Sequence, residues 1–367
     1  METRLKIADA LSAMDEAFPT ATQDDWDNSG LIVGNADDEL QGVLLTVDIT
    51  EAVVNEAVAR SCNLIIAHHP ILFRGAKRIV GANDEQRLII AAIRNNIALY
   101  ASHTCCDKSP RGTSARLAQM IGLHDVAVLV PESKYLCKIV TFVPTAHAER
   151  VRDALFSVGA GHIGAYSECS YNLDGHGTFR ALEGTHPFVG AIGQRHTEPE
   201  VRIETIVPRH RLAKALRNLI DAHPYEEPAY DIYPLENKLA TLGYGVVGNL
   251  PEPVPVPQFL SMLKTTFSCG AIRYNEYDKP IRRVAVCTGS GSEFISNALQ
   301  AHADAYITAD MKYHQFAQAD GRMLIADIGH YESEALTTQL FLEVLKEKIH
   351  KFAPCLITDS MNPIKYY

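Results

Sequence analysis

The sequence contains no apolar run that approaches the roughly 20 residues needed to span a bilayer. Its N-terminus alternates charged and apolar residues as an amphipathic helix does, and it lacks the apolar core and cleavage site of a signal peptide. We therefore expect a cytoplasmic protein without a membrane partner. Positive charge is also scarce, since the formal net charge is -10. This balance excludes a diffuse basic surface for nucleic acid but leaves room for a local cationic cleft.

Paired CxxC motifs are absent, although the chain has eight cysteines. A chain of 367 residues can bury a sizeable core without disulfide bonds, and cytosolic thiols stay reduced. Cys105 and Cys106 are adjacent, so they cannot act as paired ligands of a zinc finger. We expect them to be small buried apolar residues. The alternative is redox sensitivity, because they lie beside the candidate site described below.

The length predicts two or three domains, and 47% hydrophobic with 21% charged residues is typical of a globular protein. Up to about residue 130, apolar strands alternate with amphipathic helices, which is typical of a mostly parallel sheet covered by helices. The predicted strands are 42–49, 63–67 and 97–102, and the predicted helices are 51–60, 85–95 and 114–121.

The middle of the chain shows one pattern twice: a strand, Val-Pro, an amphipathic helix and a further extended stretch. The first copy has these parts at 138–143, 146–157 and 166–172, and the second has them at 202–207, 211–221 and 229–235. Two strand-helix-strand units predict a ferredoxin-like α+β sandwich formed by duplication. A coincidental similarity is the alternative.

A proline-rich stretch at 249–259 predicts a stiff connector, with helix-opening prolines as the alternative. Beyond it the α/β rhythm returns, with strands at 283–288, 305–308, 323–327 and 354–358 and helices at 294–300, 314–319 and 333–348. We therefore predict an interrupted three-layer α/β core, formed by residues 1–130 and 241–367, with a ferredoxin-like insert at 131–240.

Three predicted strand ends carry side chains of the kinds that bind metals. His68 and His69 follow one strand, and adjacent residues at a strand exit can reach one site while each serves a different ion. At the next, His103 is followed four residues later by Asp107, which could also be a turn or cap residue.

The third strand end carries His330 and Glu334, which are spaced i, i+4 and share one face of a predicted helix. A first-turn carboxylate favoured by the helix dipole is the alternative for Glu334.

Together these strand ends supply five nitrogen and oxygen ligands, more than one tetrahedral zinc ion needs. They are His68, His69, Asp107, His330 and Glu334. The set suits two divalent ions per subunit, with one carboxylate and a water or hydroxide between them. Mixed imidazole and carboxylate ligands suit zinc, iron, manganese, cobalt or nickel. Such a pair can ionise a nucleophile near neutral pH and stabilise a phosphoryl or carbonyl oxygen.

With these motifs, the chain resembles the NGG1p-interacting-factor-three-like family of dinuclear metal-centre proteins, also labelled GTP cyclohydrolase I type 2 homologues. The resemblance covers nearly the whole chain, and the insert resembles the PII and CutA trimer-forming proteins, most clearly at 223–235. The motifs that carry it are, in order, WDNSGLIVG (26–34), IIAHHP (65–70), SHTCCD (102–107), TGSG (288–291), DAYITADMKYH (304–314) and GHYESE (329–334).

The resemblance implies that His69 and Asp107 hold one ion, that His68 and His330 hold the other, and that Glu334 bridges both. It places three further side chains beside the site: His103, Lys312 and His314. His103 or His314 would then carry protons. The resemblance also implies a ring-shaped homohexamer whose metal sites face an internal cavity. The Cys105-Cys106 pair departs from the residues usual in relatives.

Two functions fit these expectations. The first is a metal-dependent hydrolase acting on a nucleotide-like or phosphorylated small molecule, with GTP ring opening as the variant that the family label implies. The second is a non-enzymatic metal-binding scaffold or regulator, whose insert senses a small molecule or a protein partner. The Gly289–Ser292 turn is expected to be a plain turn rather than a phosphate cradle, and Trp26 is expected to pack rather than to stack on a substrate.

Overall fold

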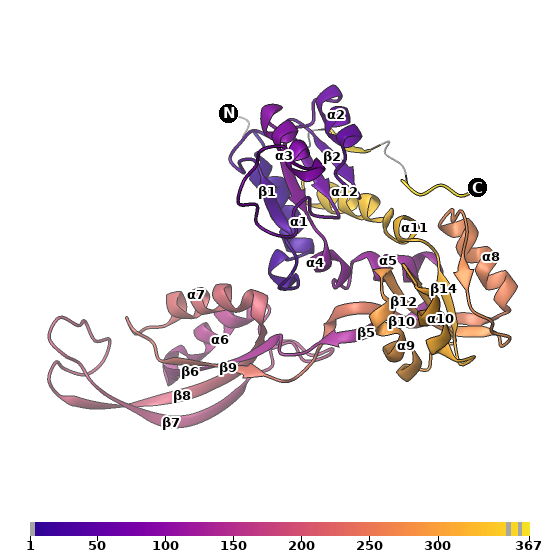
Figure 1. The fold of residues 1–367 in the computed structure, drawn as a ribbon. Coiled ribbons are helices and arrows are strands. Elements are labelled where there is room, and N and C mark those ends of the chain that lie inside the picture. The colour runs from indigo at the N-terminus through magenta and orange to yellow at the C-terminus, as the bar shows by residue number, and fades with distance from the viewer. Residues whose placement is uncertain (1–3, 350–353, 359–361) are drawn as a thin grey trace. The chain divides into compact units, whose positions relative to one another are not determined.

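The structure, a computed structural model, describes residues 4–349, 354–358 and 362–367. Its described part is a mixed α/β fold with three sheets (Figure 1). The chain divides into two compact units: a core of Met1–Val130 with Thr241–Tyr367, and an insert of Pro131–Ala240. Among the helices of the described residues, none is both long and apolar enough to cross a bilayer.

The first sheet of the core has five strands in the order β1-β4-β3-β2-β15. These strands are β1 (Gly30–Val33), β2 (Val43–Thr46), β3 (Leu64–Ala67), β4 (Ala98–Ala101) and β15 (Cys355–Ile357). All neighbours are parallel except β1 and β4. Successive side chains of β2 point to opposite faces, so Val43 and Leu45 join one apolar cluster and Leu44 joins another.

Helices cover both faces of this sheet, which makes it the middle of three layers. The cluster on one face includes α1 (Ile7–Ala17) and α12 (Thr337–Lys348), and the cluster on the other includes α2 (Glu51–Ala59) and α3 (Asp84–Arg94).

The second sheet of the core has six strands in the order β11-β14-β13-β12-β10-β5. They are β5 (His124–Glu132), β10 (Leu239–Val254), β11 (Arg273–Tyr274), β12 (Ile281–Ser290), β13 (Ala305–Ala309) and β14 (Leu324–Asp327). The central strands β12, β13 and β14 are parallel. Helices α5 (Thr113–Met120) and α8 (Val256–Thr266) pack on one face, and α9 (Ile295–Gln300) packs on the other. The core therefore contains two sheets, and each of them includes strands from both halves of the core sequence. The periodicity of the sequence had suggested a single core.

The insert has a four-stranded antiparallel sheet in the order β7-β8-β6-β9. Its elements follow in the chain as β6 (Leu136–Pro144), α6 (Ala148–Phe156), β7 (Tyr171–Arg180), β8 (Arg195–Pro208), α7 (Leu212–Ala222) and β9 (Tyr230–Leu235). Both helices lie on the same face of the sheet (Figure 1), where apolar residues of β6, β8, α6 and α7 form one cluster.

Three predicted elements differ from the structure. The extended stretch at 166–172 becomes a strand only at Tyr171 and continues to Arg180. The proline-rich stretch is not a connector, because β10 runs to Val254 and α8 starts at Val256. Its prolines are tolerated where the pairing of β10 with β12 is irregular. The long helix predicted at 333–348 is two helices, α11 (His330–Glu334) and α12.

Candidate metal centre

The five predicted ligands come together at strand ends of both core sheets. His68 and His69 directly follow β3, and Asp107 ends the short helix α4 (Thr104–Asp107), which follows β4. His330 and Glu334 are the first and last residues of α11, which follows β14. The carboxyl ends of parallel strands are where α/β proteins bind ligands, because backbone and side-chain groups converge there.

Ligand atoms of these residues lie at distances suited to shared metal ions. His68 Nε2 is 3.6 Å from Asp107 Oδ1 and 3.6 Å from Glu334 Oε1. Glu334 Oε2 is 3.1 Å from His69 Nε2 and 2.9 Å from His330 Nε2, and these two nitrogens are 3.4 Å apart. Ligands that surround one ion tetrahedrally at 2.0–2.2 Å lie about 3.3–3.6 Å from one another. The ligand atoms fall into two groups, one of His68, Asp107 and Glu334 and the other of His69, His330 and Glu334. Each group could therefore hold a metal ion.

The grouping differs from the one implied by the family resemblance. That resemblance paired His69 with Asp107 and His68 with His330, whereas the short distances group His68 with Asp107 and His69 with His330. Glu334 Oε1 faces His68, and Glu334 Oε2 faces the other two histidines. Glu334 belongs to both groups, as a bridging carboxylate does.

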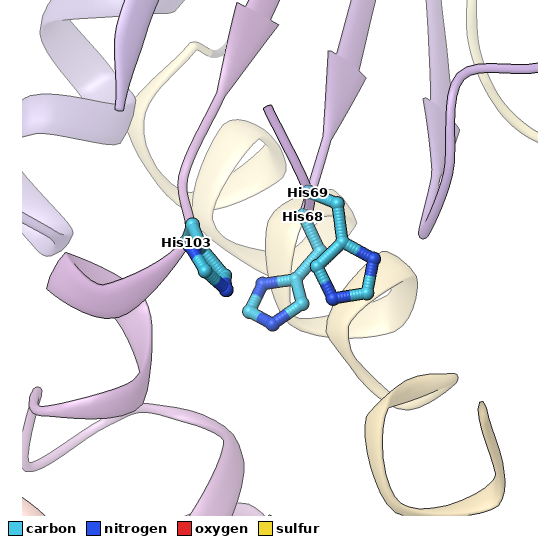
Figure 2. A group of neighbouring side chains, drawn as sticks. All are labelled: His68, His69 and His103. Atoms are coloured by element: carbon cyan, nitrogen blue, oxygen red, sulfur yellow. The ribbon is translucent and has the colours of Figure 1, made fainter. Parts of the chain in front are cut away.

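His103, which was expected beside the site as a proton carrier, is in direct contact with two of the predicted ligands. Its ring centroid is 5.2 Å from that of His68 and 5.3 Å from that of His69. Figure 2 shows the three rings side by side, with His68 and His69 at the end of one strand and His103 where the next strand leads into α4. These three residues form a third group that could hold a metal ion.

Each of the four histidines uses its Nδ1 atom in a hydrogen bond to an oxygen. The partners are Ser102 O for His68 (3.0 Å), Asp48 Oδ1 for His69 (2.8 Å), Asp27 Oδ1 for His103 (2.9 Å) and Asp310 Oδ2 for His330 (2.7 Å). A neutral ring that donates through Nδ1 keeps its lone pair on Nε2, and a carboxylate partner makes that nitrogen a better metal ligand. The Nε2 atoms are thereby prepared for metal binding.

Two buried atoms of the cluster lack a hydrogen-bond partner among the described residues. They are His68 Nε2 and Glu334 Oε2, and the contacts of Glu334 Oε2 to histidine nitrogens do not have hydrogen-bond geometry. Buried polar atoms without partners are costly and rare, so they call for a ligand. Bound metal ions would satisfy both atoms. The residues present therefore fit a metal centre.

Gly289 leaves the space that Glu334 occupies. A Cβ atom at this position would collide with Glu334 Oε1, and the backbone has φ +64°, which favours glycine.

The electrostatic field of the cluster also favours cations. Burial lowers the pKa of His69, but the carboxylates of Asp48 and Glu334 outweigh it and raise the pKa to about 10. Burial also lowers the pKa of His330, but the carboxylate of Glu334 outweighs this effect and raises the pKa to about 9. Burial raises the pKa of Glu334, yet the nearby histidines hold it well below its usual value. Surroundings that stabilise an imidazolium also stabilise a divalent cation.

The carboxylates of the cluster outnumber what a single ion could balance. Five of them line it or hold its histidines: Asp27, Asp48, Asp107, Asp310 and Glu334. If metal binding kept the histidines neutral and all five carboxylates were ionised, the cluster would carry five negative charges, of which two divalent ions would offset four.

Sequence reasoning missed four residues of the site. Asp48 and Asp310 follow β2 and β13, so their strand-end positions could have indicated them. Asp27 lies within the WDNSG motif and also accepts hydrogen bonds from the backbone and hydroxyl of Thr104. Gly289 lies in the TGSG turn, where only the packing against Glu334 reveals its importance.

Two other predicted features are not part of the cluster. His314 is exposed on α10 (Tyr313–Phe316), contacts the ring of Tyr313 and belongs to none of the three groups; its role as a proton carrier stays a prediction. In the Gly289–Ser292 turn, Gly289 N–H donates to Ser333 Oγ and Gly291 N–H donates to Thr308 Oγ1. These donors are used within the fold, as in the plain turn that was expected.

The adjacent cysteines are buried, as predicted. Burial raises the pKa of the Cys105 thiol to about 11 and that of the Cys106 thiol well above its usual value. Because the thiolate is the reactive form, both are poor nucleophiles. Trp26 is 58% exposed, and its ring contacts those of Phe73 and His103.

The model of the family Duf34/NIF3 (NGG1p interacting factor 3) matches residues 5–363. The chain belongs to this family. Among its relatives, the Duf34/NIF3 chain is 39% identical to the GTP cyclohydrolase 1 type 2 homolog of Halalkalibacterium halodurans, over 91% of this chain and 89% of the relative. It is 35% identical to the protein of the same name from Bacillus subtilis, over 89% of this chain and 88% of the relative.

Solved structures share the whole fold of this Duf34/NIF3 protein. A crystal structure of a Bacillus cereus protein related to NIF3 matches with a TM-score of 0.86 at 36% identity, over 100% of both chains. A Staphylococcus aureus protein matches with a TM-score of 0.76 at 28% identity, over 99% of both chains.

Proposed function

We propose that this protein is a dinuclear metal-dependent hydrolase that acts on a nucleotide-like or phosphorylated small molecule. The observation that carries the proposal is the position of Glu334, whose two carboxylate oxygens each approach a separate group of ligands. A carboxylate shared in this way is typical of two-metal hydrolytic sites.

In this proposal His68, Asp107 and Glu334 hold one ion, and His69, His330 and Glu334 hold the other. A bound pair of divalent ions would lower the pKa of water and neutralise charge on a phosphoryl or carbonyl oxygen. The ion could be zinc, iron, manganese, cobalt or nickel, since all accept imidazole and carboxylate ligands.

His103 is the residue of this chain best placed to move a proton. Its Nδ1 is held by Asp27 at 2.9 Å, so Nε2 is the atom that would accept and return a proton near the ions. His314 is a second candidate for this role, since it is exposed and lies four residues after Asp310, which contacts His330.

The names of the relatives favour a nucleotide substrate. Two relatives are called GTP cyclohydrolase 1 type 2 homologs, which points to ring opening of GTP as one reaction to test. A fold does not fix a reaction, so hydrolysis of a phosphodiester or of another nucleotide belongs in the same test.

The experiment is turnover by purified protein loaded separately with each of the five metals, against GTP, other nucleotides and a phosphodiester. We expect one metal form to turn over a member of the panel and His68→Ala to abolish that turnover. Activity that survives His68→Ala would contradict the proposal. Tyr166→Ala, an exposed position in the insert, serves as the matched control and should keep full activity.

A second function is favoured by a cavity in the insert. We infer that the insert is a ferredoxin-like, PII- or CutA-like module, which its strand order supports. The cavity has a volume of about 720 Å³ and is lined by residues of β7, β8, the 181–188 loop and the segment between α7 and β9, including Phe179, Glu200 and Tyr225. A volume of this size suits a small ligand. The protein would then be a non-enzymatic metal-binding regulator that senses a small molecule or a protein partner.

Two measurements separate these functions. Tight metal content without turnover across the panel would favour the regulator. Retained turnover after deletion of residues 131–240 would make the insert accessory to catalysis. We further propose a cytoplasmic homohexamer with its metal centres facing an internal cavity. Light scattering that gives the mass of a monomer would contradict the hexamer.

A further inference from the structure

Two large aromatic side chains beside the metal centre are exposed. Trp26 is 58% exposed and Phe73 is 46% exposed, and their ring centroids are 6.3 Å apart with an angle of 31° between the ring planes. Aromatic side chains of this size bury a large area when they find a partner, so an exposed pair at one place indicates a binding surface.

Both rings border the histidine cluster directly. The centroid of the His103 ring lies 5.8 Å from that of Trp26 and 5.7 Å from that of Phe73, and its plane makes angles of 77° and 73° with theirs. His103 in turn contacts His68 and His69, the side chains shown with it in Figure 2. A molecule resting on the aromatic pair would therefore lie within reach of the proposed metal ions.

A cationic segment begins at the same place. Phe73 is followed by Arg74, Lys77 and Arg78, all of them exposed. Within residues 4–349, 354–358 and 362–367, none of the three has an acidic partner at ion-pair distance. In a chain with a net charge of -10, three exposed cations in the segment that follows Phe73 provide a local attraction for anionic groups.

We propose that Trp26 and Phe73 form a stacking platform for the planar heteroaromatic ring of a nucleotide, and that Arg74, Lys77 and Arg78 attract its phosphate. The inference rests on the proposed function and deepens it, because it names the substrate class and the residues that select it. Bases stack on exposed aromatic rings because every base has a π-face, and phosphate adds charge complementarity.

The sequence offers a direct probe, since Trp26 is the only tryptophan. Its fluorescence should fall in a saturable manner when GMP is added to chelator-treated or zinc-loaded protein. Ribose 5-phosphate carries the same phosphate without the ring, and it should leave the emission nearly unchanged. Equal quenching by both compounds would overturn the proposal, because it would mean that the phosphate alone is recognised.

Calorimetry with variants tests the platform independently of fluorescence. Trp26→Ala should raise the Kd for GMP roughly 5- to 100-fold, the range expected for one stacked base. Trp26→Phe keeps a ring and should retain most of the affinity, and Tyr166→Ala, an exposed aromatic of the insert, should change nothing. The triple alanine variant of Arg74, Lys77 and Arg78 should weaken GMP and ribose 5-phosphate by similar factors.

The competing explanation is that the aromatic pair is a contact between copies of the chain. A change in oligomeric mass in Trp26→Ala with an unchanged Kd for GMP would establish that explanation and overturn ours. Failure of the hydrolase proposal remains distinguishable, because ring binding is measured without turnover. GMP bound through Trp26 but never hydrolysed would refute the enzyme and leave the platform standing.

Discussion

The Nε2 atoms of His69 and His330 lie 3.4 Å apart, and Oε2 of Glu334 lies 2.9 Å from one and 3.1 Å from the other. The first histidine comes from the five-stranded sheet and the second from the helix that follows the six-stranded sheet. Glu334 thus connects candidate ligands that follow strands of different sheets.

Metal stoichiometry should depend on which group loses a ligand. Because Glu334 belongs to both groups, Glu334→Ala should remove both ions. Asp107→Asn should remove one ion and leave the other, which His69 and His330 hold. Elemental analysis after dialysis measures ions per chain, with His314→Ala as the control that keeps both. If Asp107→Asn and Glu334→Ala lose the same number of ions, the two-group assignment is wrong.

The glycine beside the bridging carboxylate should be required for metal binding. Gly289→Ala places a Cβ against Glu334 Oε1, so it should displace that side chain and lower metal content. Gly321→Ala is a matched control, because Gly321 has a nearly equal φ of +65° but open space around it. Both variants should lose about 1–2 kcal/mol from backbone strain. Only the first should also lose metal; equal metal content in the two would refute the steric argument.

The carboxylate behind His69 should tune metal affinity without binding the ion. Asp48→Asn weakens the acceptor for His69 Nδ1–H, so we expect a 10- to 100-fold weaker affinity for one ion. Competition with a chromogenic chelator measures this change. Asp37→Asn, at an exposed ion pair with Lys6, is the control and should have no effect. An unchanged metal affinity in Asp48→Asn would show that the hydrogen bond between Asp48 and His69 does not contribute to metal binding.

His223 should make the insert less stable in mild acid. Its Nδ1 accepts from Tyr225 N–H at 3.0 Å and its Nε2–H donates to Phe142 O at 3.0 Å, so the folded state holds the neutral ring. Burial lowers the pKa of His223, and a nearby His147 adds to the effect. Below the ordinary histidine pKa of about 6.5, the unfolded chain therefore binds a proton that the folded chain does not bind, and stability decreases as the pH is lowered.

The measurement for this pH effect is the midpoint of thermal unfolding of metal-free protein between pH 8 and 5.5. The wild-type midpoint should fall more steeply below pH 6.5 than that of His223→Gln, which cannot titrate at this position. Parallel curves for the two proteins would mean that His223 carries no pH dependence.

The sequence predicted most helices and strands of the core because their apolar residues recur with clear periods. Val43–Thr46 and Leu64–Ala67 are buried throughout and stand out as continuous apolar runs. Periodicity does not say which strands pair, so the division into two sheets could not be predicted. Periodicity did not predict the break between α11 and α12, where the hydroxyls of Thr337 and Thr338 donate to the carbonyls of Glu334 and Ala335, a kind of bond that often bends helices.

The strand-end positions predicted which side chains gather in the candidate cluster, whereas the grouping of their ligand atoms could not be predicted. Which oxygen of Glu334 faces which histidine depends on the packing of α11 against the Gly289 turn, and no sequence spacing encodes it. The supporting carboxylates Asp27, Asp48 and Asp310 are ordinary loop residues in the sequence, and only their contacts to histidine Nδ1 atoms give them a role.

The path of the chain through the two sheets has a mechanical consequence. After building the six-stranded sheet, the chain returns through α12 and β15 to the five-stranded one. His68, His69 and Asp107 follow strands of the five-stranded sheet, and His330 follows a strand of the six-stranded sheet. Metal ions bound by all four residues would therefore cross-link the two sheets. Removal of the ions would then weaken the connection between the two sheets, and small-angle scattering before and after chelation would detect the change as an increase in the radius of gyration.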